Sequence, residues 1–131
     1  MSVHDLNEFQ NQVSELLLRH RSLLDVLSKY QQSNSTVNRS VIKAITECGC
    51  IEVAARKQPY DAETSGEQLK DLLNTHVQGG LCDHCVDVIE TELGKNLFYM
   101  SALCNLLHID LNEVLERESK KCQTLGFFNM S

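Results

Sequence analysis

The amino-acid sequence predicts an all-α protein, a bundle of four to five helices forming a single domain over residues 1–131. Apolar side chains recur at three- and four-residue steps over most of the chain, which is the period of helices that bury one face. The chain contains one proline and six glycines. No stretch alternates polar and apolar residues in the way that half-buried strands do. A chain of 131 residues is also long enough to bury a hydrophobic core.

The first predicted helix covers residues 4–31, where the apolar positions form one continuous stripe. A polar connection follows at residues 31–36. The second predicted helix runs from this connection to about Lys57, and Pro59 ends it because proline lacks an amide hydrogen and clashes with the preceding turn.

The segment after Pro59 is expected to contain a loop and a short amphipathic helix over residues 66–76. Two glycines then break the chain. The central helix is predicted to begin at Cys82 and to end near His108, and it is expected to lie antiparallel to the second helix. These two helices form the centre of the predicted bundle.

The last predicted helix covers residues 111–121, with Asp110 as its N-cap, and residues 124–131 form a tail. Cys104 and Cys122 are expected in the core, because a free cysteine behaves as a small hydrophobic residue.

Acidic side chains gather in the first half of the central helix, whereas the stretch from Leu97 to Leu107 is almost wholly apolar. Carboxylates at the mouth of a helix-lined cleft can hold a divalent cation. The alternative is a solvated acidic turn, which the helix macrodipole favours near an N-terminus. The acidic residues concerned are Asp83, Asp87, Glu90 and Glu92.

Charge and hydropathy exclude some classes of partner. The net charge is −6 and there is no basic stripe, so nucleic-acid binding is not expected. No apolar run approaches the roughly 20 residues that span a bilayer. The N-terminus is acidic where a secretion signal is basic and then apolar, so we expect a cytoplasmic protein. In that compartment the six cysteines are expected to be thiols or metal ligands rather than disulfides.

Two glutamates each precede a glycine by two positions, in Glu47-Cys-Gly-Cys and Glu92-Leu-Gly-Lys. Here the chain resembles the MazG-like all-α nucleoside triphosphate pyrophosphohydrolases, most closely over residues 91–115 and more weakly over 47–57. The resemblance implies two antiparallel helices that meet at their glycines. It also implies a nucleotide substrate, a Mg²⁺ cofactor and assembly into a dimer or tetramer. The segment 58–80 is an insertion relative to that family.

The departures from the family pattern fall at the metal ligands. Cys50 and Lys95 stand where the family has its second pair of carboxylates, which removes two anionic ligands and adds a cation. The remaining candidates for a carboxylate site are Glu47, Glu52, Glu92 and Asp87. Mg²⁺ prefers several oxygen ligands, so this loss weakens its binding.

Lys95 can replace the missing metal if its ammonium group pairs with Glu47 or Glu92 across the two helices. The alternative is that its side chain extends into solvent and contacts neither carboxylate. Lys95 and Asn96 are also the candidate substrate-binding residues.

A second hypothesis rests on Cys48, Cys50, Cys82 and Cys85, which supply the thiols of a zinc or iron–sulfur site. The alternatives are a redox-active or zinc half-site at Cys82 and Cys85, or reduced and packed thiols. His76 and His84 are additional nitrogen ligands. If Cys50 stays helical, it lies on the order of 10 Å along the axis from Cys85 at about 1.5 Å per residue. A joint site therefore needs a bent or re-registered helix, or a second subunit.

Taken together, these features predict a MazG-like protein with a degenerate metal motif, weakly active or non-catalytic, with a binding or regulatory role. The first alternative is an active Mg²⁺-dependent enzyme that converts nucleoside triphosphates to monophosphates and pyrophosphate. The second alternative is a cysteine-based zinc, iron–sulfur or redox-sensing protein.

Overall fold

The structure of the chain is a computed structural model that describes residues 5–16, 21–59 and 73–125. These residues are mostly helical, as the sequence predicts, with one small two-stranded sheet that it does not predict. The elements in chain order are α1 (Leu6–Leu16), α2 (Leu23–Lys43), the π-helical turn η1 (Ala44–Cys48), β1 (Ile51–Val53), β2 (Val77–Gly79), α4 (Asp83–Leu106) and α5 (Leu111–Leu125).

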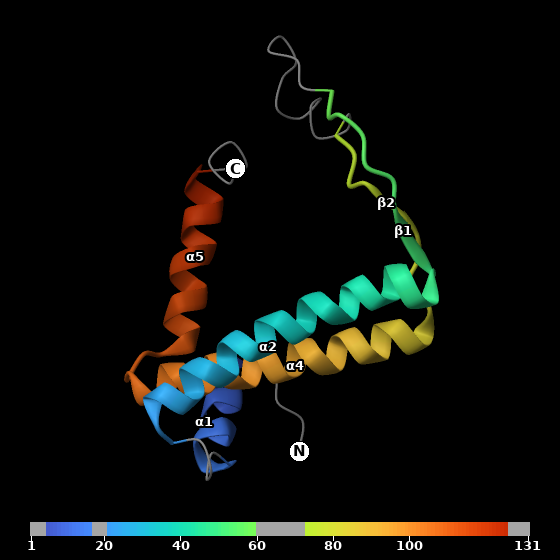
Figure 1. The fold of residues 1–131 in the computed structure, drawn as a ribbon. Coiled ribbons are helices and arrows are strands. Elements are labelled where there is room, and N and C mark those ends of the chain that lie inside the picture. Colours follow the sequence, from blue (N-terminus) through green and yellow to red (C-terminus); the bar gives the residue numbers. More distant parts are fainter. Residues whose placement is uncertain (1–4, 17–20, 60–72, 126–131) are drawn as a thin grey trace.

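The two long helices α2 and α4 lie side by side and antiparallel, and they form the centre of the molecule (Figure 1). Their interface contains small buried side chains, among them Ser40, Ser101 and Ala102. Small side chains allow the two helix axes to approach closely. The expected antiparallel helix pair is therefore present.

The first two predicted helices have different boundaries in the structure. Helix α1 is described as far as Leu16, Arg21 and Ser22 are not helical, and α2 begins at Leu23, so residues 31–36 lie inside a helix and are not a connection. The prediction of a connection was wrong because it relied on the small polar residues of this segment, which are typical of loops. Here Ser33 is buried, and the hydroxyl of Thr36 donates to the Gln32 carbonyl oxygen at 3.0 Å. Tertiary packing thus overrides the local preference.

The second predicted helix ends earlier than expected. After Lys43 the chain makes the single turn η1, and Gly49 then adopts a left-handed conformation with φ 79°. The prediction of helix to Lys57 was wrong because it treated Gly49 as a helix-interior residue.

An antiparallel ribbon follows this turn. Ile51 pairs with Gly79 and Val53 pairs with Val77. Three-residue strands are too short to produce a recognisable alternation in the sequence. Of the short helix predicted over 66–76, residues 73–76 are not helical and the rest lies outside the described part.

The hydrophobic core lies where α1 crosses the α2–α4 pair. Its fully buried members are Val13, Val26 and Ala102, with Phe9, Phe98, Leu103 and Leu106 packed around them. Gln10 fixes α1 to the α4–α5 turn. Its Nε2 donates to the carbonyl oxygen of Ile109 at 2.8 Å, and its Oε1 accepts from the amide of Leu111 at 2.9 Å. This end of the helix pair is stabilised by apolar burial and by a buried amide.

The predicted cap of α5 is confirmed, since Asp110 Oδ1 accepts from the amides of Asn112 and Glu113 at 2.8 and 3.4 Å. The helix extends to Leu125, beyond the predicted end, and residues 126–131 of the predicted tail lie outside the described chain. Cys104 is buried, as predicted. Cys122 is exposed on α5, so its prediction as a core residue was wrong.

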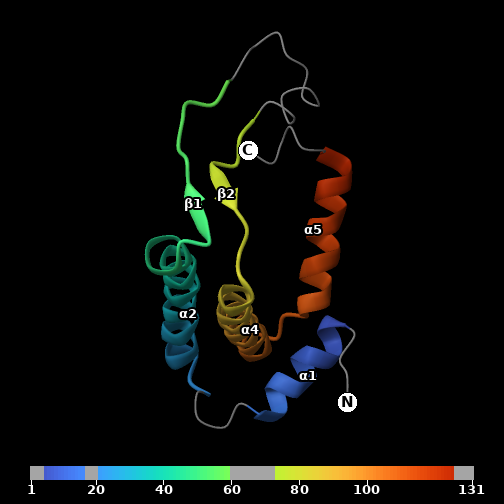
Figure 2. The same ribbon diagram turned by 90° about the vertical axis from the view of Figure 1, so that its right-hand side faces the viewer.

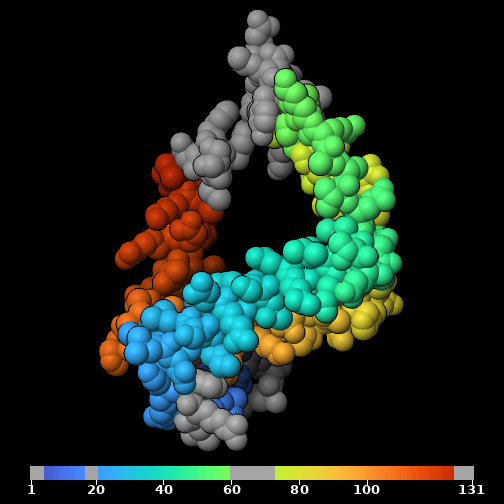
Figure 3. Space-filling model, viewed as in Figure 1, coloured from blue at the N-terminus to red at the C-terminus, as the bar shows by residue number. Residues whose placement is uncertain are grey.

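Two elements project from opposite ends of the α2–α4 pair. Helix α5 rises from one end and the β1–β2 ribbon from the other (Figure 1), and both extend to the same side of the pair (Figure 2). The space-filling view shows both of them standing away from the pair (Figure 3). None of the helices in the described ranges is both long and apolar enough to cross a membrane.

Candidate metal centre

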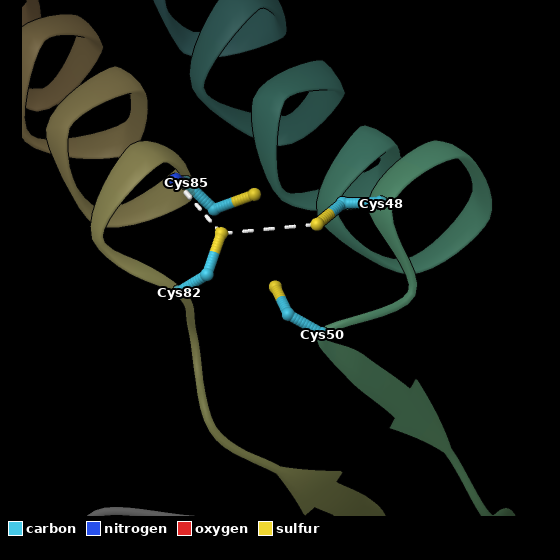
Figure 4. A group of neighbouring side chains, drawn as sticks. All are labelled: Cys48, Cys50, Cys82 and Cys85. Carbon is cyan, nitrogen blue, oxygen red and sulfur yellow. Dashed lines mark hydrogen bonds between the residues drawn. The ribbon is translucent and has the colours of Figure 1, made fainter.

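Four cysteine side chains converge where α2 gives way to the ribbon and the ribbon leads into α4 (Figure 4). The sulfur atoms of Cys48, Cys50, Cys82 and Cys85 all lie within 4.8 Å of one another. They come from η1, from the residue before β1, and from the N-terminal end of α4. The structure therefore brings together the four cysteines that the sequence singled out. The expected separation of Cys50 from Cys85 along a continuous helix was wrong, because the helix ends at Cys48.

Gly49 makes this arrangement possible on the α2 side. Its amide donates to the carbonyl oxygen of Ala44 at 2.9 Å, which closes the π-helical turn, and its positive φ turns the chain back. Glycine is the residue that adopts this conformation without steric cost. Cys48 and Cys50 therefore both face α4.

The expected close approach of the helices at their glycines was wrong. A side-chain carbon added at Gly49 or at Gly94 would meet nothing within 4 Å. The two positions have different roles: Gly49 ends a helix, and Gly94 lies on an open face of α4.

Gly79 is a site residue that the sequence analysis missed. It pairs with Ile51 and has φ +87°, and a Cβ at this position would lie 2.6 Å from the carbonyl oxygen of Cys50. Only glycine fits this close contact with the backbone of Cys50. The signal in the sequence was the Gly79-Gly80 pair just before Cys82.

On the α4 side, Cys82 is both a member of the cysteine cluster and the N-cap of the helix. Its sulfur accepts the amide hydrogen of Cys85 at 3.4 Å. An N-cap side chain satisfies an amide at positions N2 or N3, which explains the spacing of two residues between Cys82 and Cys85. Cys85 is buried at the start of the helix, where it packs with Ala44 and Ile51.

The thiols differ in acidity. The amide of Cys85, followed by its side chain, lowers the pKa of Cys82 from 9.0 to about 7. Burial is the main cause that raises the pKa of Cys85 to about 12. For Cys48, the amide of Cys50 lowers the pKa, but hydrogen bonds with the thiols of Cys82 and Cys50 outweigh it and the pKa rises. Among the thiols of the cluster whose pKa is shifted, that of Cys82 is therefore the most easily ionised.

The spacing of the sulfurs fits one tetrahedral ion. The Sγ atoms of Cys48 and Cys82 are 3.7 Å apart. Zinc–thiolate bonds of about 2.3 Å set the sulfurs of a tetrahedral site about 3.8 Å apart. In a [4Fe–4S] cluster each cysteine binds a different iron atom, and in a [2Fe–2S] cluster two cysteines bind each iron, so the sulfurs surround more than one metal atom, whereas here all four lie within 4.8 Å of one another. A mononuclear site therefore fits this geometry better than a cluster.

The candidate carboxylates do not form a comparable group. Glu47 and Glu92 line one cleft between α2 and η1 on one side and α4 on the other. Glu52 is exposed on β1, and Asp87 is exposed on α4. Within the described ranges, the four cysteines are the only cluster of three or more acidic, histidine or cysteine ligands near enough to share an ion. Nothing in this arrangement supports a Mg²⁺ site.

Lys95 and Asn96 have separate roles. The Lys95 ammonium lies 3.5 Å from Glu92 Oε1 one turn away on the same helix, and the lysine side chain is 61% exposed. The pairing is therefore with Glu92 within α4 and does not bridge the two helices. Asn96 does connect them, because its Nδ2 donates to Oδ1 of Asn34 on α2.

The two histidines that were candidate ligands lie outside the cysteine cluster. His84 is exposed and lines the cleft next to Cys48 and Cys85. His76 has φ 62° at the end of the ribbon, and its carbonyl oxygen accepts the Ala54 amide at 2.8 Å.

Comparisons with known proteins do not identify a family: no family model, no curated protein and no solved structure matches the chain. The resemblance to the MazG-like proteins stays a prediction from the sequence.

Proposed function

We propose that the protein binds one Zn²⁺ ion through Cys48, Cys50, Cys82 and Cys85. The observation that carries the proposal is the convergence of four sulfurs within 4.8 Å from two segments that are 32 or more residues apart in the sequence. Zinc is bound by thiolates in tetrahedral geometry, and four cysteines leave no open position on the ion. A closed site of this kind supports structure and not chemistry at the metal.

The role of the ion is to hold together the end of the helix pair that has little apolar core. The buried residues around the cysteines are Ala44, Ile51 and Cys85. Four metal–sulfur bonds would join η1, the residue before β1 and the start of α4, and so fix the ribbon to both helices. Metal binding and folding are coupled in such sites, because the unfolded chain does not present the ligands together.

Metal analysis under reducing conditions tests the proposal. Protein stripped with a chelator and reloaded is expected to bind one Zn²⁺ per chain. Co²⁺ in its place should give the intense sulfur-to-metal absorption of a tetrahedral tetrathiolate site. A loaded protein with less than half an ion per chain, or a Co²⁺ spectrum without thiolate bands, would refute the site.

We propose further that the chain is a non-catalytic or weakly active relative of the MazG-like pyrophosphohydrolases, with a binding or regulatory role. The antiparallel α2–α4 pair and the presence of Glu47 and Glu92 in one cleft support the relationship. Catalysis is disfavoured because Lys95 contacts Glu92, and because Glu52 and Asp87 are exposed on other parts of the surface.

Pyrophosphate release from a panel of nucleoside triphosphates with Mg²⁺ or Mn²⁺ tests this part separately. We expect no turnover above the level of a Glu92→Gln variant. Turnover that disappears in that variant would instead establish an active enzyme.

A homo-oligomer, a dimer in the simplest case, is the third part of the proposal. Large apolar side chains on α2 and α4 are exposed, and apolar surface of this kind is typical of association sites. Light scattering at micromolar concentration measures the state directly, and a monomer would refute it. The exposed residues on these two helices are Leu23, Leu24, Leu27, Ile42, Leu93 and Leu97.

A further inference from the structure

A cleft of about 520 Å³ runs along the α2–α4 pair from the metal centre toward its middle. Its walls are residues of α2 and η1 on one side and of α4 on the other. Ala44 and Val88 give it apolar lining. Small-molecule sites have volumes of about 300 to 1,000 Å³ and combine an apolar lining with a few polar groups. The cleft is therefore large enough for a small organic molecule.

The α2 wall of the cleft carries two cations one helical turn apart, Arg39 and Lys43. Like charges at this spacing repel each other on a helix surface. In the part of the chain that the structure describes, neither side chain takes part in an ion pair. Two carboxylates also line the cleft: Glu92 on the facing wall contacts Lys95, and Glu47 follows Lys43 by one turn. Arg39, Lys43 and Lys95 together carry three positive charges against these two negative ones, so the local balance is one positive charge.

The opposite wall contributes His84, in the first turn of α4. A histidine can donate a hydrogen bond to an oxyanion in its neutral or its charged form. The start of a helix also carries the positive end of its macrodipole. Cations and donors therefore face the cleft from both walls.

We propose that this cleft binds a small organic anion whose phosphate or carboxylate group is held by Arg39 and Lys43. The planar guanidinium group of Arg39 matches the oxygen pairs of both kinds of anion. The organic part of the ligand lies against Val88 and Ala44. The inference goes beyond the zinc site and does not depend on it, since none of the residues that hold the ligand binds the ion.

The charge of the metal centre determines which end of the cleft the anion occupies. Zn²⁺ with four thiolates has a net negative charge, which repels an anion near Cys48 and Cys85. Arg39 lies nine residues before Cys48, about 13 Å along a helix at about 1.5 Å per residue. Coulomb energies fall with distance and are screened by salt, so the nearby cations dominate there. The anionic group therefore binds at the end of the cleft that is far from the metal.

Isothermal titration of the zinc-loaded full chain at low salt tests the proposal with three probes: inorganic phosphate, glycerol 3-phosphate and succinate. We expect saturable binding of at least one of them, with one ligand per chain. Glycerol 3-phosphate binding more tightly than phosphate indicates a phosphoryl ligand with an organic part. Succinate binding most tightly of the three indicates a carboxylate ligand.

Arg39→Gln and Lys43→Gln are expected to weaken binding about tenfold each, and the double variant more. Arg56→Gln, on an exposed part of the segment after β1, is the matched control and should leave affinity unchanged. The side chains of Arg39, Lys43 and Arg56 are exposed, so the three variants should fold and bind zinc as the wild type does. Circular dichroism and metal analysis check this.

The absence of saturable binding for all three probes, or an equal loss of affinity with Arg56→Gln, would overturn the proposal. A zinc-free wild-type protein that still binds the probe would leave this inference intact even if the metal assignment fails.

Discussion

The two ends of the α2–α4 pair are stabilised in different ways. At one end, α1 packs Val13 against Val26 and Ala102, and Gln10 hydrogen-bonds the α4–α5 turn. At the other end, among the described residues, the buried cluster is Ala44, Ile51 and Cys85, and four cysteine sulfurs lie within 4.8 Å of one another. The first end is held by apolar burial, whereas the proposed zinc ion would add its stabilisation at the second. Metal content and core packing should therefore be separable by mutation.

Loss of one thiolate is expected to have the largest effect. Structural zinc sites are worth about 10 to 16 kcal/mol, so each of four ligands accounts for about 3 kcal/mol, roughly a hundredfold in affinity. Cys85→Ser should lower zinc affinity by about that factor in a competition titration with a chromophoric chelator. Cys122→Ser, on the exposed face of α5, is the control and should bind zinc as the wild type does. Equal affinities for the two variants would mean that Cys85 is not a ligand.

A cavity at the other end tests whether the two ends are independent. Val26 is fully buried, and Val26→Ala is expected to cost about 2 to 3 kcal/mol of unfolding free energy. Denaturant unfolding of the zinc-loaded protein measures this loss. Zinc affinity should not change, because sites without shared contacts behave additively. A parallel fall in zinc affinity would show that the two ends fold as one unit.

Adjacent glycines offer a finer comparison within the metal end. Gly79→Ala places a methyl group against the carbonyl oxygen of Cys50 in a backbone conformation with φ +87°, whereas a side chain at Gly80 meets nothing within 4 Å. Strain of this kind costs about 1 to 3 kcal/mol. We expect Gly79→Ala to lower zinc affinity about tenfold and Gly80→Ala to change it little. If the two variants bind zinc equally well, the ribbon does not position Cys50.

The same two ends differ in how far the sequence predicted them. Periodicity and capping residues were enough to predict the apolar positions of α4, its start at Cys82 and the Asp110 cap of α5, because these signals are local. The choice of the four cysteines that converge also needed only their type and spacing.

The path of the chain at the metal end could not be read in this way. It depends on the left-handed conformation of Gly49 and on the pairing of two strands that are separated by 23 residues. Neither leaves a periodic signal. The polar residues 31–36 were misleading for the opposite reason: their local preference is for a loop, whereas in the structure they lie within α2, which packs along α4, with Ser33 buried and Asn34 hydrogen-bonded to Asn96 of α4.

The smallest expected effect concerns the acidity of the cysteines once zinc is removed. With a pKa of about 7, half of Cys82 is thiolate at neutral pH, against about one hundredth of a thiol with the ordinary value of 9.0. The more acidic thiolate is also a weaker nucleophile, so the net gain in alkylation rate at pH 7 is about fivefold. In chelator-treated protein, the reaction of Cys82 with iodoacetamide, followed by mass spectrometry, should rise with pH to a plateau above about pH 8. Cys85, whose pKa is raised to about 12, should react last of the four.

Zinc should suppress the reaction at both Cys82 and Cys85. A Cys82 rate that keeps rising through pH 9 would mean that the amide of Cys85 does not cap this sulfur, and that the metal end loses its local order when the ion is removed.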